Sequence, residues 1–68
     1  MRTFKFSYYL VNVEKVGYLT QGFCTKTGVA ERYVAILVDG VELREYFKDY
    51  EEQNKRYKKV EEFLKCKF

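Results

Sequence analysis

The 68-residue sequence contains no histidine, no proline and no tryptophan, and it has only two cysteines. Without histidine, a general base that works near neutral pH would have to be a carboxylate, lysine, cysteine or tyrosine whose pKa is strongly shifted in a desolvated pocket. A chain of this length has little volume for such a pocket. The four glycines are scattered as single residues and form no phosphate-binding motif. We therefore expect a protein that is not an enzyme and that needs no cofactor.

The two cysteines, Cys24 and Cys66, lie far apart in the sequence and do not form a CxxC motif. A zinc site with four ligands would need two carboxylates or a second chain, because histidine is absent. We expect two ordinary reduced thiols and no metal site.

Long hydrophobic runs are also missing. No stretch approaches the ~20 apolar residues that span a bilayer, and the N-terminus has no apolar core of a signal peptide. The expectation is a cytoplasmic protein with no membrane partner.

The residues that are present are those of a folded domain with one small core. Hydrophobic residues make up 47% of the chain and charged residues 34%, a composition typical of folded proteins rather than disordered ones. Seven tyrosines and six phenylalanines place a large buried area in few positions. No linker, repeat or low-complexity segment divides the sequence, so we expect a single domain over residues 1–68.

The segment from Thr3 to Val13 alternates between apolar and polar side chains, which predicts one β-strand with one buried face. Tyr8 is then expected to be buried together with Phe4 and Phe6. Tyr9 falls on the opposite face, beside Lys5 and Ser7.

The next segment, residues 18–25, is again rich in β-formers. Residues 14–17 interrupt the two segments with polar residues and a glycine, so we expect the segments to pair as an antiparallel hairpin. Gly22 inside the second segment indicates a bulge or a close approach of another group to the backbone. Residues 26–28, Lys-Thr-Gly, predict a turn.

Residues 29–38 fit two interpretations. In a helix, apolar side chains from Val29 to Leu37 would recur on one face, with Thr27 and Gly40 at the two ends. In a strand, residues 33–38 would be an apolar, β-branched run, followed by Asp39-Gly40 and then by the alternating residues 41–43. We favour the strand, because aspartate and glycine both tolerate the positive φ angles of a tight hairpin turn.

The final segment, from Arg44 to Phe68, predicts a long amphipathic helix centred on residues 45–65. At 100° per residue, seven side chains fall on one side of this helix, which we expect to be its buried face: Tyr46, Tyr50, Gln53, Tyr57, Val60, Leu64 and Phe68. Acidic residues precede basic ones at i, i+4 spacing, for example Glu52 and Arg56, and each such pair adds a few tenths of a kcal/mol. The predicted fold is therefore α+β, a small antiparallel sheet of three to four strands (residues 1–43) packed against one C-terminal helix (residues 44–68).

One candidate for binding is the basic run at residues 55–59, Lys-Arg-Tyr-Lys-Lys, which could neutralise phosphates. Helical geometry spreads these cations around the helix, and four glutamates flank them. The net charge of +3 is small for a nucleic-acid-binding protein. We therefore interpret the run as a solvated helix surface.

Aromatic side chains on an open sheet are a second candidate, since they could stack on unpaired bases. Most of them are needed for the core, which leaves Tyr9 available for a partner. Residues 22–26 with Ala30 and Glu31 faintly resemble a short part of the arm-binding domain of tyrosine recombinases, a family that contacts DNA through a sheet. The match is too short to place the chain in that family.

The sequence thus leaves two hypotheses for a non-catalytic binding module. The first is a protein-interaction domain of an accessory or inhibitor type, whose partner is either another protein or a second copy of the chain. The alternative is a nucleic-acid-binding domain. The candidate binding residues for either are Lys5, Tyr9, Lys55, Arg56, Lys58 and Lys59.

Overall fold

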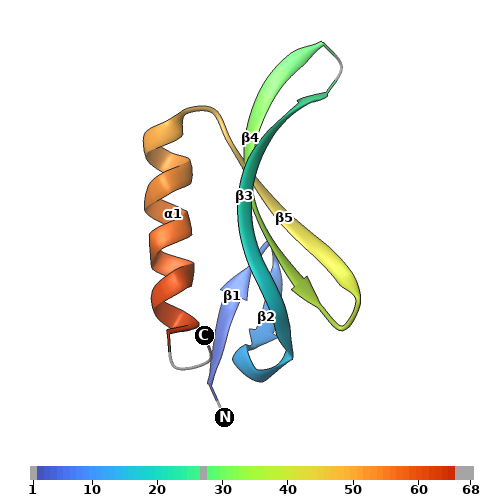
Figure 1. Cartoon of the computed structure of the whole chain (residues 1–68), viewed down its shortest axis with the longest axis vertical. Coiled ribbons are helices and arrows are strands. Elements are labelled where there is room, and N and C mark those ends of the chain that lie inside the picture. The colour runs from blue at the N-terminus through green and yellow to red at the C-terminus, as the bar shows by residue number, and fades with distance from the viewer. Residues whose placement is uncertain (1, 27, 66–68) are drawn as a thin grey trace.

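Five antiparallel strands and one helix follow one another along the part of the chain that the structure describes (Figure 1). The structure is a computed structural model, and it describes residues 2–26 and 28–65. The elements are β1 (Thr3–Phe6), β2 (Tyr9–Asn12), a short 3-10 turn (Val13–Lys15), β3 (Val16–Lys26), β4 (Val29–Val38), β5 (Val41–Phe47) and α1 (Tyr50–Phe63). The predicted α+β fold is confirmed, although the strands form two sheets, one of two strands and one of three.

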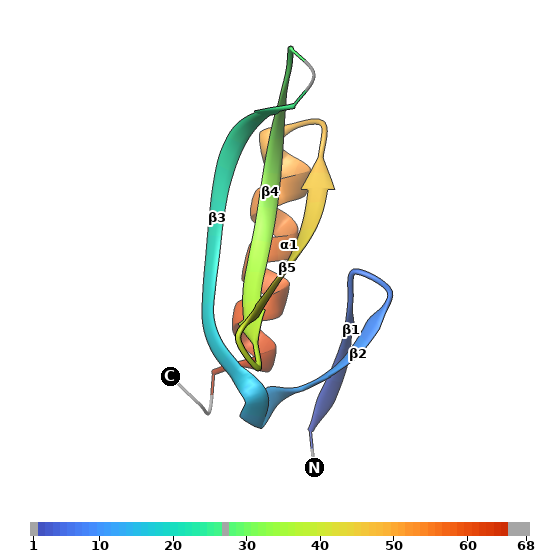
Figure 2. The ribbon, with the colours of Figure 1, turned by 90° about the vertical axis from the view of Figure 1, so that its right-hand side faces the viewer.

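The larger sheet has the order β3-β4-β5, with β4 in the centre. Residues 29–38 form a strand, as favoured from the sequence, and Asp39 and Gly40 form the hairpin turn with φ angles of 50° and 80°. The helical alternative for this segment is wrong. The helix α1 lies along one face of this sheet, and Figure 2 shows the opposite face turned toward the viewer.

The N-terminal segment is a hairpin and not the single strand that we predicted. β1 pairs with β2 through a two-residue turn at Ser7 and Tyr8, whose φ angles are 47° and 71°. The turn reverses the chain and removes Tyr8 from the core, so its side chain is 99% exposed instead of buried. The expected hairpin between the first two segments is also wrong, because β3 pairs with β4. The Ser-Tyr turn has none of the glycine or asparagine that marks such turns in a sequence.

The C-terminal helix begins later than predicted. Residues 44–47 belong to β5, where they pair with β4, and Asp49 caps the helix by accepting a hydrogen bond from the backbone N of Glu52 at 2.8 Å. Tyr46 therefore lies on a strand, and both Tyr46 and Tyr50 are exposed rather than buried. Of the predicted buried face, Gln53, Val60 and Leu64 are buried and Tyr57 packs at its edge. Phe68, Cys66 and Thr27 lie outside the described residues.

The core fills the space between α1, the inner face of the larger sheet and the β1–β2 hairpin. Its buried members are apolar side chains from all of these elements: Phe4, Phe6, Val11, Val13, Val16, Val34, Ile36, Val60 and Leu64. One polar residue, Gln53, is also buried, and its Nε2 donates to the carbonyl oxygens of Gly22 and Tyr33 at 2.8 and 2.9 Å. This amide ties the helix to neighbouring strands of the sheet.

Candidate functional site

The face of the larger sheet that α1 does not cover carries three tyrosines. The register places Tyr18 beside Leu37 and Glu42 in one row, Ala35 beside Arg44 in the next, and Gly22 beside Tyr33 and Tyr46 in a third. We call Tyr18, Tyr33, Glu42, Arg44 and Tyr46 the tyrosine face. Tyr18 and Tyr46 are 40% and 43% exposed. The tyrosine face is thus an aromatic surface that faces solvent.

Arg44, Tyr33 and Tyr46 contact one another on this face. The guanidinium carbon of Arg44 lies 4.1 Å from the ring centroid of Tyr33, and the rings of Tyr33 and Tyr46 meet edge to face at 6.3 Å. Gly22 provides the space for Tyr33, because a Cβ at this position would lie 2.7 Å from the tyrosine hydroxyl. The close approach expected at Gly22 is therefore confirmed. These contacts hold Tyr33, Arg44 and Tyr46 in place, which reduces the entropy that is lost when a partner binds.

The charges on the tyrosine face are paired with each other. Glu42 accepts hydrogen bonds from the Tyr18 hydroxyl at 2.9 Å and from Arg44 Nε at 2.8 Å. These bonds from Arg44 and Tyr18 lower the pKa of Glu42, and the same carboxylate raises the pKa of Tyr18. Hydrogen bonds with Tyr46 and Glu42 raise the pKa of Arg44. The ion pair leaves the face close to neutral.

Exposed apolar side chains also gather at the end of the β1–β2 hairpin. We call Tyr8, Tyr9 and Leu10 the hairpin tip; they are 99%, 57% and 74% exposed. Tyr8 occupies the left-handed backbone region, which is costly for a residue with a side chain and is found at functional sites more often than elsewhere. Because its side chain is fully exposed, Tyr8 contributes little to the packing of the single chain and is available to a partner.

The hairpin tip is held in place by the Arg56 network, which consists of Arg56, Glu45 and the backbone of Lys5 and Ser7. Arg56 Nε donates to Glu45 Oε1 at 2.7 Å, and Arg56 Nη2 donates to the carbonyl oxygen of Lys5 at 2.7 Å. Glu45 Oε2 in turn accepts from the backbone N of Ser7 at 2.9 Å. The network joins α1, β5 and the hairpin, so the tip is positioned by side chains distant in sequence.

A groove of about 640 Å³ connects the hairpin tip with the tyrosine face. Its lining comes from the turn of the hairpin, from β5 and from α1: Ser7, Tyr8, Arg44, Glu45, Tyr46, Phe47 and Arg56. Because Tyr8 belongs to the tip and Tyr46 to the tyrosine face, the two surfaces form one continuous candidate site.

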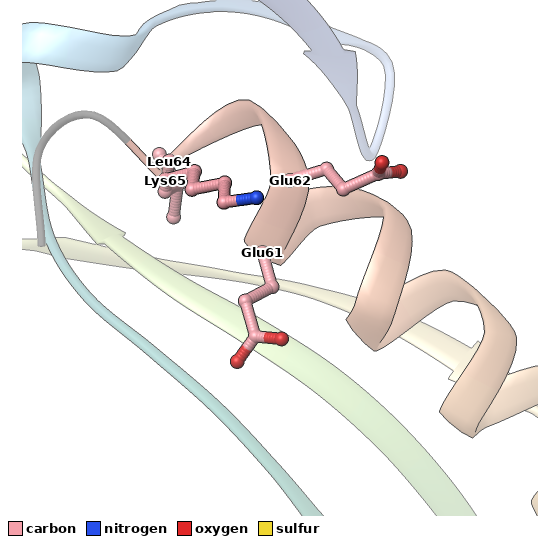
Figure 3. Close-up of a pocket in the computed structure, with 4 residues that line it drawn as sticks. All are labelled: Glu61, Glu62, Leu64 and Lys65. Atoms are coloured by element: carbon pink, nitrogen blue, oxygen red, sulfur yellow. The ribbon is translucent and has the colours of Figure 1, made fainter.

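A second hollow, of about 370 Å³, lies at the end of α1 and is lined by Glu61, Glu62, Leu64 and Lys65. Figure 3 shows the carboxylates of Glu61 and Glu62 pointing in different directions rather than toward a common point. They therefore do not make a convergent site for a ligand.

The six binding residues suggested by the sequence do not gather in one place. Tyr9 belongs to the hairpin tip, and Lys5 is exposed on β1. Lys55, Lys58 and Lys59 are exposed on α1, on the helix side of the sheet and away from the tyrosine face. Arg56 is largely enclosed in its network and pairs with Glu45 rather than with Glu52 as predicted. The structure thus places the exposed lysines of α1 away from the tyrosine face.

Sequence reasoning missed Tyr18, Tyr33, Arg44 and Tyr46 as candidate site residues. Tyr18 and Tyr33 lie on different strands, and only the register places them on the same face of the sheet. Arg44 and Tyr46 had been assigned to the helix. The alternating pattern of residues 41–47 was the available signal, since it fits a strand with two distinct faces.

Within residues 2–26 and 28–65, no cluster of cysteine and acidic side chains is arranged to hold a metal ion. Over the same residues, no helix has the length and apolar character needed to cross a membrane. Comparison with models of protein families gives no match, and neither do comparisons with curated proteins or with solved structures.

Proposed function

We propose that this chain is a non-catalytic protein-interaction module that binds a protein partner through the tyrosine face and the hairpin tip, in the cytoplasm. The observation that carries the proposal is the group of tyrosines on one face, where Tyr18 and Tyr46 are 40% and 43% exposed and the ring of Tyr46 meets that of Tyr33 edge to face. A fully exposed Tyr8 lies beside this face. Tyrosine and arginine are enriched at the centres of protein interfaces, where they bury large area at low entropic cost.

The pairing of the charges favours a protein partner over a nucleic acid. Binding to nucleic acid draws most of its affinity from cations that neutralise phosphates. On the tyrosine face, Arg44 already forms an ion pair with Glu42. Lys55, Lys58 and Lys59 lie on α1, on the other side of the sheet. A nucleic-acid strand whose bases stack on the tyrosines would therefore not reach these lysines.

A set of matched variants tests the proposal. Affinity capture from cells that express the protein should yield a protein partner, which is then purified and titrated against each variant. Tyr18→Thr/Tyr46→Thr removes the two more exposed of the three tyrosine rings and keeps residues that favour strands. We expect it to weaken binding at least tenfold. Lys58→Gln/Lys59→Gln, on the opposite side, should bind as the unchanged protein does. Circular dichroism checks that both variants are folded.

Titration with single-stranded and duplex oligonucleotides provides the opposing arm. We expect no tight binding at physiological salt. Submicromolar binding that falls steeply with added salt, and that is lost in Lys58→Gln/Lys59→Gln, would contradict the proposal and establish the nucleic-acid alternative. A protein partner that binds Tyr18→Thr/Tyr46→Thr with unchanged affinity would exclude the tyrosine face as its docking surface.

A further inference from the structure

The outer edge of β3 is unpaired. β3 lies at one edge of the larger sheet, and no other strand in the described part of the chain pairs with its outer side. Figure 2 shows it running along one side of the molecule. Its sequence from Val16 to Thr25 contains no charged residue and no proline. A long, uncharged edge with free peptide groups is a template for another strand.

The opposite edge of the same sheet is built differently. β5 carries the charged residues Glu42, Arg44 and Glu45, and the β1–β2 hairpin is held beside it by the bond from Ser7 N to Glu45. Charges and covering segments are the usual means by which proteins keep an edge strand from pairing. β5 has both kinds of protection, whereas the free edge of β3 has neither between residues 16 and 25.

The position of Gln53 shows which peptide groups of β3 point outward. Its single Nε2 bonds the carbonyl oxygens of both Gly22 and Tyr33, which form one cross-strand pair. Both oxygens must therefore point into the ladder between β3 and β4. The N–H and C=O groups of successive residues point to alternate sides of a strand. The N–H and C=O groups of Leu19, Gln21 and Phe23 therefore point toward the open edge.

We propose that two copies of this chain dimerise through antiparallel pairing of β3 with β3, about a twofold axis at Gln21. In this register Leu19 faces the copy's Phe23, and Phe23 faces the copy's Leu19. Phe23 is 60% exposed in the single chain, and it would be covered by an apolar neighbour on the helix side. Both strands are uncharged here, so the pairing brings no like charges together despite the net charge of +3 on each chain.

The side chain of Gln21 provides an independent reason for placing the twofold axis at this residue. Its Oε1 is buried and has no hydrogen-bond partner among the described residues. Buried polar atoms without a partner are rare in folded proteins. Directly opposite residues of an antiparallel pair have Cβ atoms about 5 Å apart, so the copy's Gln21 would bring a second amide within hydrogen-bonding reach.

The geometry leaves room for both helices. α1 packs most closely on β4, the central strand. In the six-stranded sheet, two copies of β4 would be separated by three strand spacings, about 14 Å. Helices with their side chains are about 10–12 Å across. The dimer would also join the two tyrosine faces into one surface, but its formation does not depend on the function proposed above.

An edge of this length is small for an interface. Interfaces below about 1,200 Å² in total are typical of weak complexes, so we expect an equilibrium between monomer and dimer at micromolar concentrations. Sedimentation equilibrium from low to high micromolar concentrations should show the average molecular mass rising from that of one chain toward that of two.

Two matched variants test the edge. Phe23→Glu places a charge on the edge, yet the new carboxylate faces Arg32 within the same chain, which preserves the fold. Tyr50→Glu is the control, because Tyr50 has a similar exposure of 55% and also lies near Arg32, but on α1. We expect Phe23→Glu to remain a monomer and Tyr50→Glu to dimerise as the unchanged chain does. A chain that stays monomeric throughout, or a Phe23→Glu variant that dimerises normally, would overturn the proposal.

Disulfide crosslinking tests the register. With Gln21 at the axis, residue 18 of one copy faces Cys24 of the other, so Tyr18→Cys in a Cys66→Ser background should form a covalent dimer under mild oxidation. Val41→Cys in the same background is the control, since Val41 is 59% exposed and lies on the other edge strand. Equal crosslinking of the two variants, or none in Tyr18→Cys, would refute this register. Neither result bears on partner binding by the tyrosine face.

Discussion

The Arg56 network should be one of the larger contributions to stability outside the apolar core. Arg56 connects α1 to β5 through Glu45 and to the hairpin through the carbonyl oxygen of Lys5, with both shortest distances at 2.7 Å. Its guanidinium also lies 5.6 Å from the ring centroid of Phe6. If this network positions the hairpin, its removal should destabilise the whole domain.

The size of the effect follows from burial. Exposed ion pairs contribute about 0.2–1 kcal/mol, whereas removing one partner of a buried pair costs about 3–5 kcal/mol. The side chains of Arg56 and Glu45 are 25% and 21% exposed, so Arg56→Gln should cost about 2 kcal/mol, between these limits. With a urea dependence of about 1 kcal/mol per molar for a chain of this size, the unfolding midpoint should fall by about 2 M.

Urea denaturation followed by circular dichroism measures this change. Lys58→Gln is the matched control, because it removes an exposed cation from the same helix, and its midpoint should stay within experimental error. The double variant Arg56→Gln/Glu45→Gln should destabilise by less than the sum of the single variants, because both act on one interaction. An Arg56→Gln midpoint equal to that of Lys58→Gln would refute the role of this network.

Two further predictions concern the core and the tyrosine face. Leu64→Ala should cost ~2–4 kcal/mol, because Leu64 is completely buried, whereas Leu10→Ala at the exposed tip should cost little; equal urea midpoints would show that Leu64 is not in the core. Glu42→Gln should lower the pKa of Tyr18 toward the ordinary value of 10.0 by removing the carboxylate that raises it. NMR of the tyrosine ring carbons during a pH titration measures this, and an unchanged Tyr18 pKa would exclude its bond to Glu42.

Glu42 should also make the stability of the folded chain depend on pH in a defined direction. Its pKa is lowered in the folded protein, so its contribution is present above the pKa of the unfolded chain and is lost as pH falls through the lowered value. Glu42→Gln should remove this part of the acid dependence.

The parts of the fold that could be predicted have local causes. The turn at Asp39 and Gly40 is encoded in two adjacent residues that tolerate positive φ, and it supports the strands on both sides. Gln53, Val60 and Leu64 were placed on the buried face by helical spacing alone, and all three are buried. These signals depend on near neighbours in the sequence.

Apart from the start of α1, the errors arose where distant residues decide the structure. Nothing in Ser7 and Tyr8 favours a tight turn, which is stabilised instead by Arg56 and Glu45 from other elements. The start of α1 did have a local signal, since Asp49 followed three residues later by Glu52 is a helix-start pattern. The tyrosine face could not be predicted without the register, because Tyr18 and Tyr46 come from strands that are separated by β4.

Site-specific photo-crosslinking can show whether a protein partner docks on the tyrosine face. The photoreactive analogue p-benzoylphenylalanine, placed at position 46 on the tyrosine face or at position 58 on the outer side of α1, reports what touches each surface in cells that express the protein. Tyr46 is 43% exposed and Lys58 is also exposed, so both positions are accessible. We expect a discrete protein adduct from position 46 and none from position 58. An adduct from position 58 alone, or a nucleic-acid adduct from either position, would contradict this expectation.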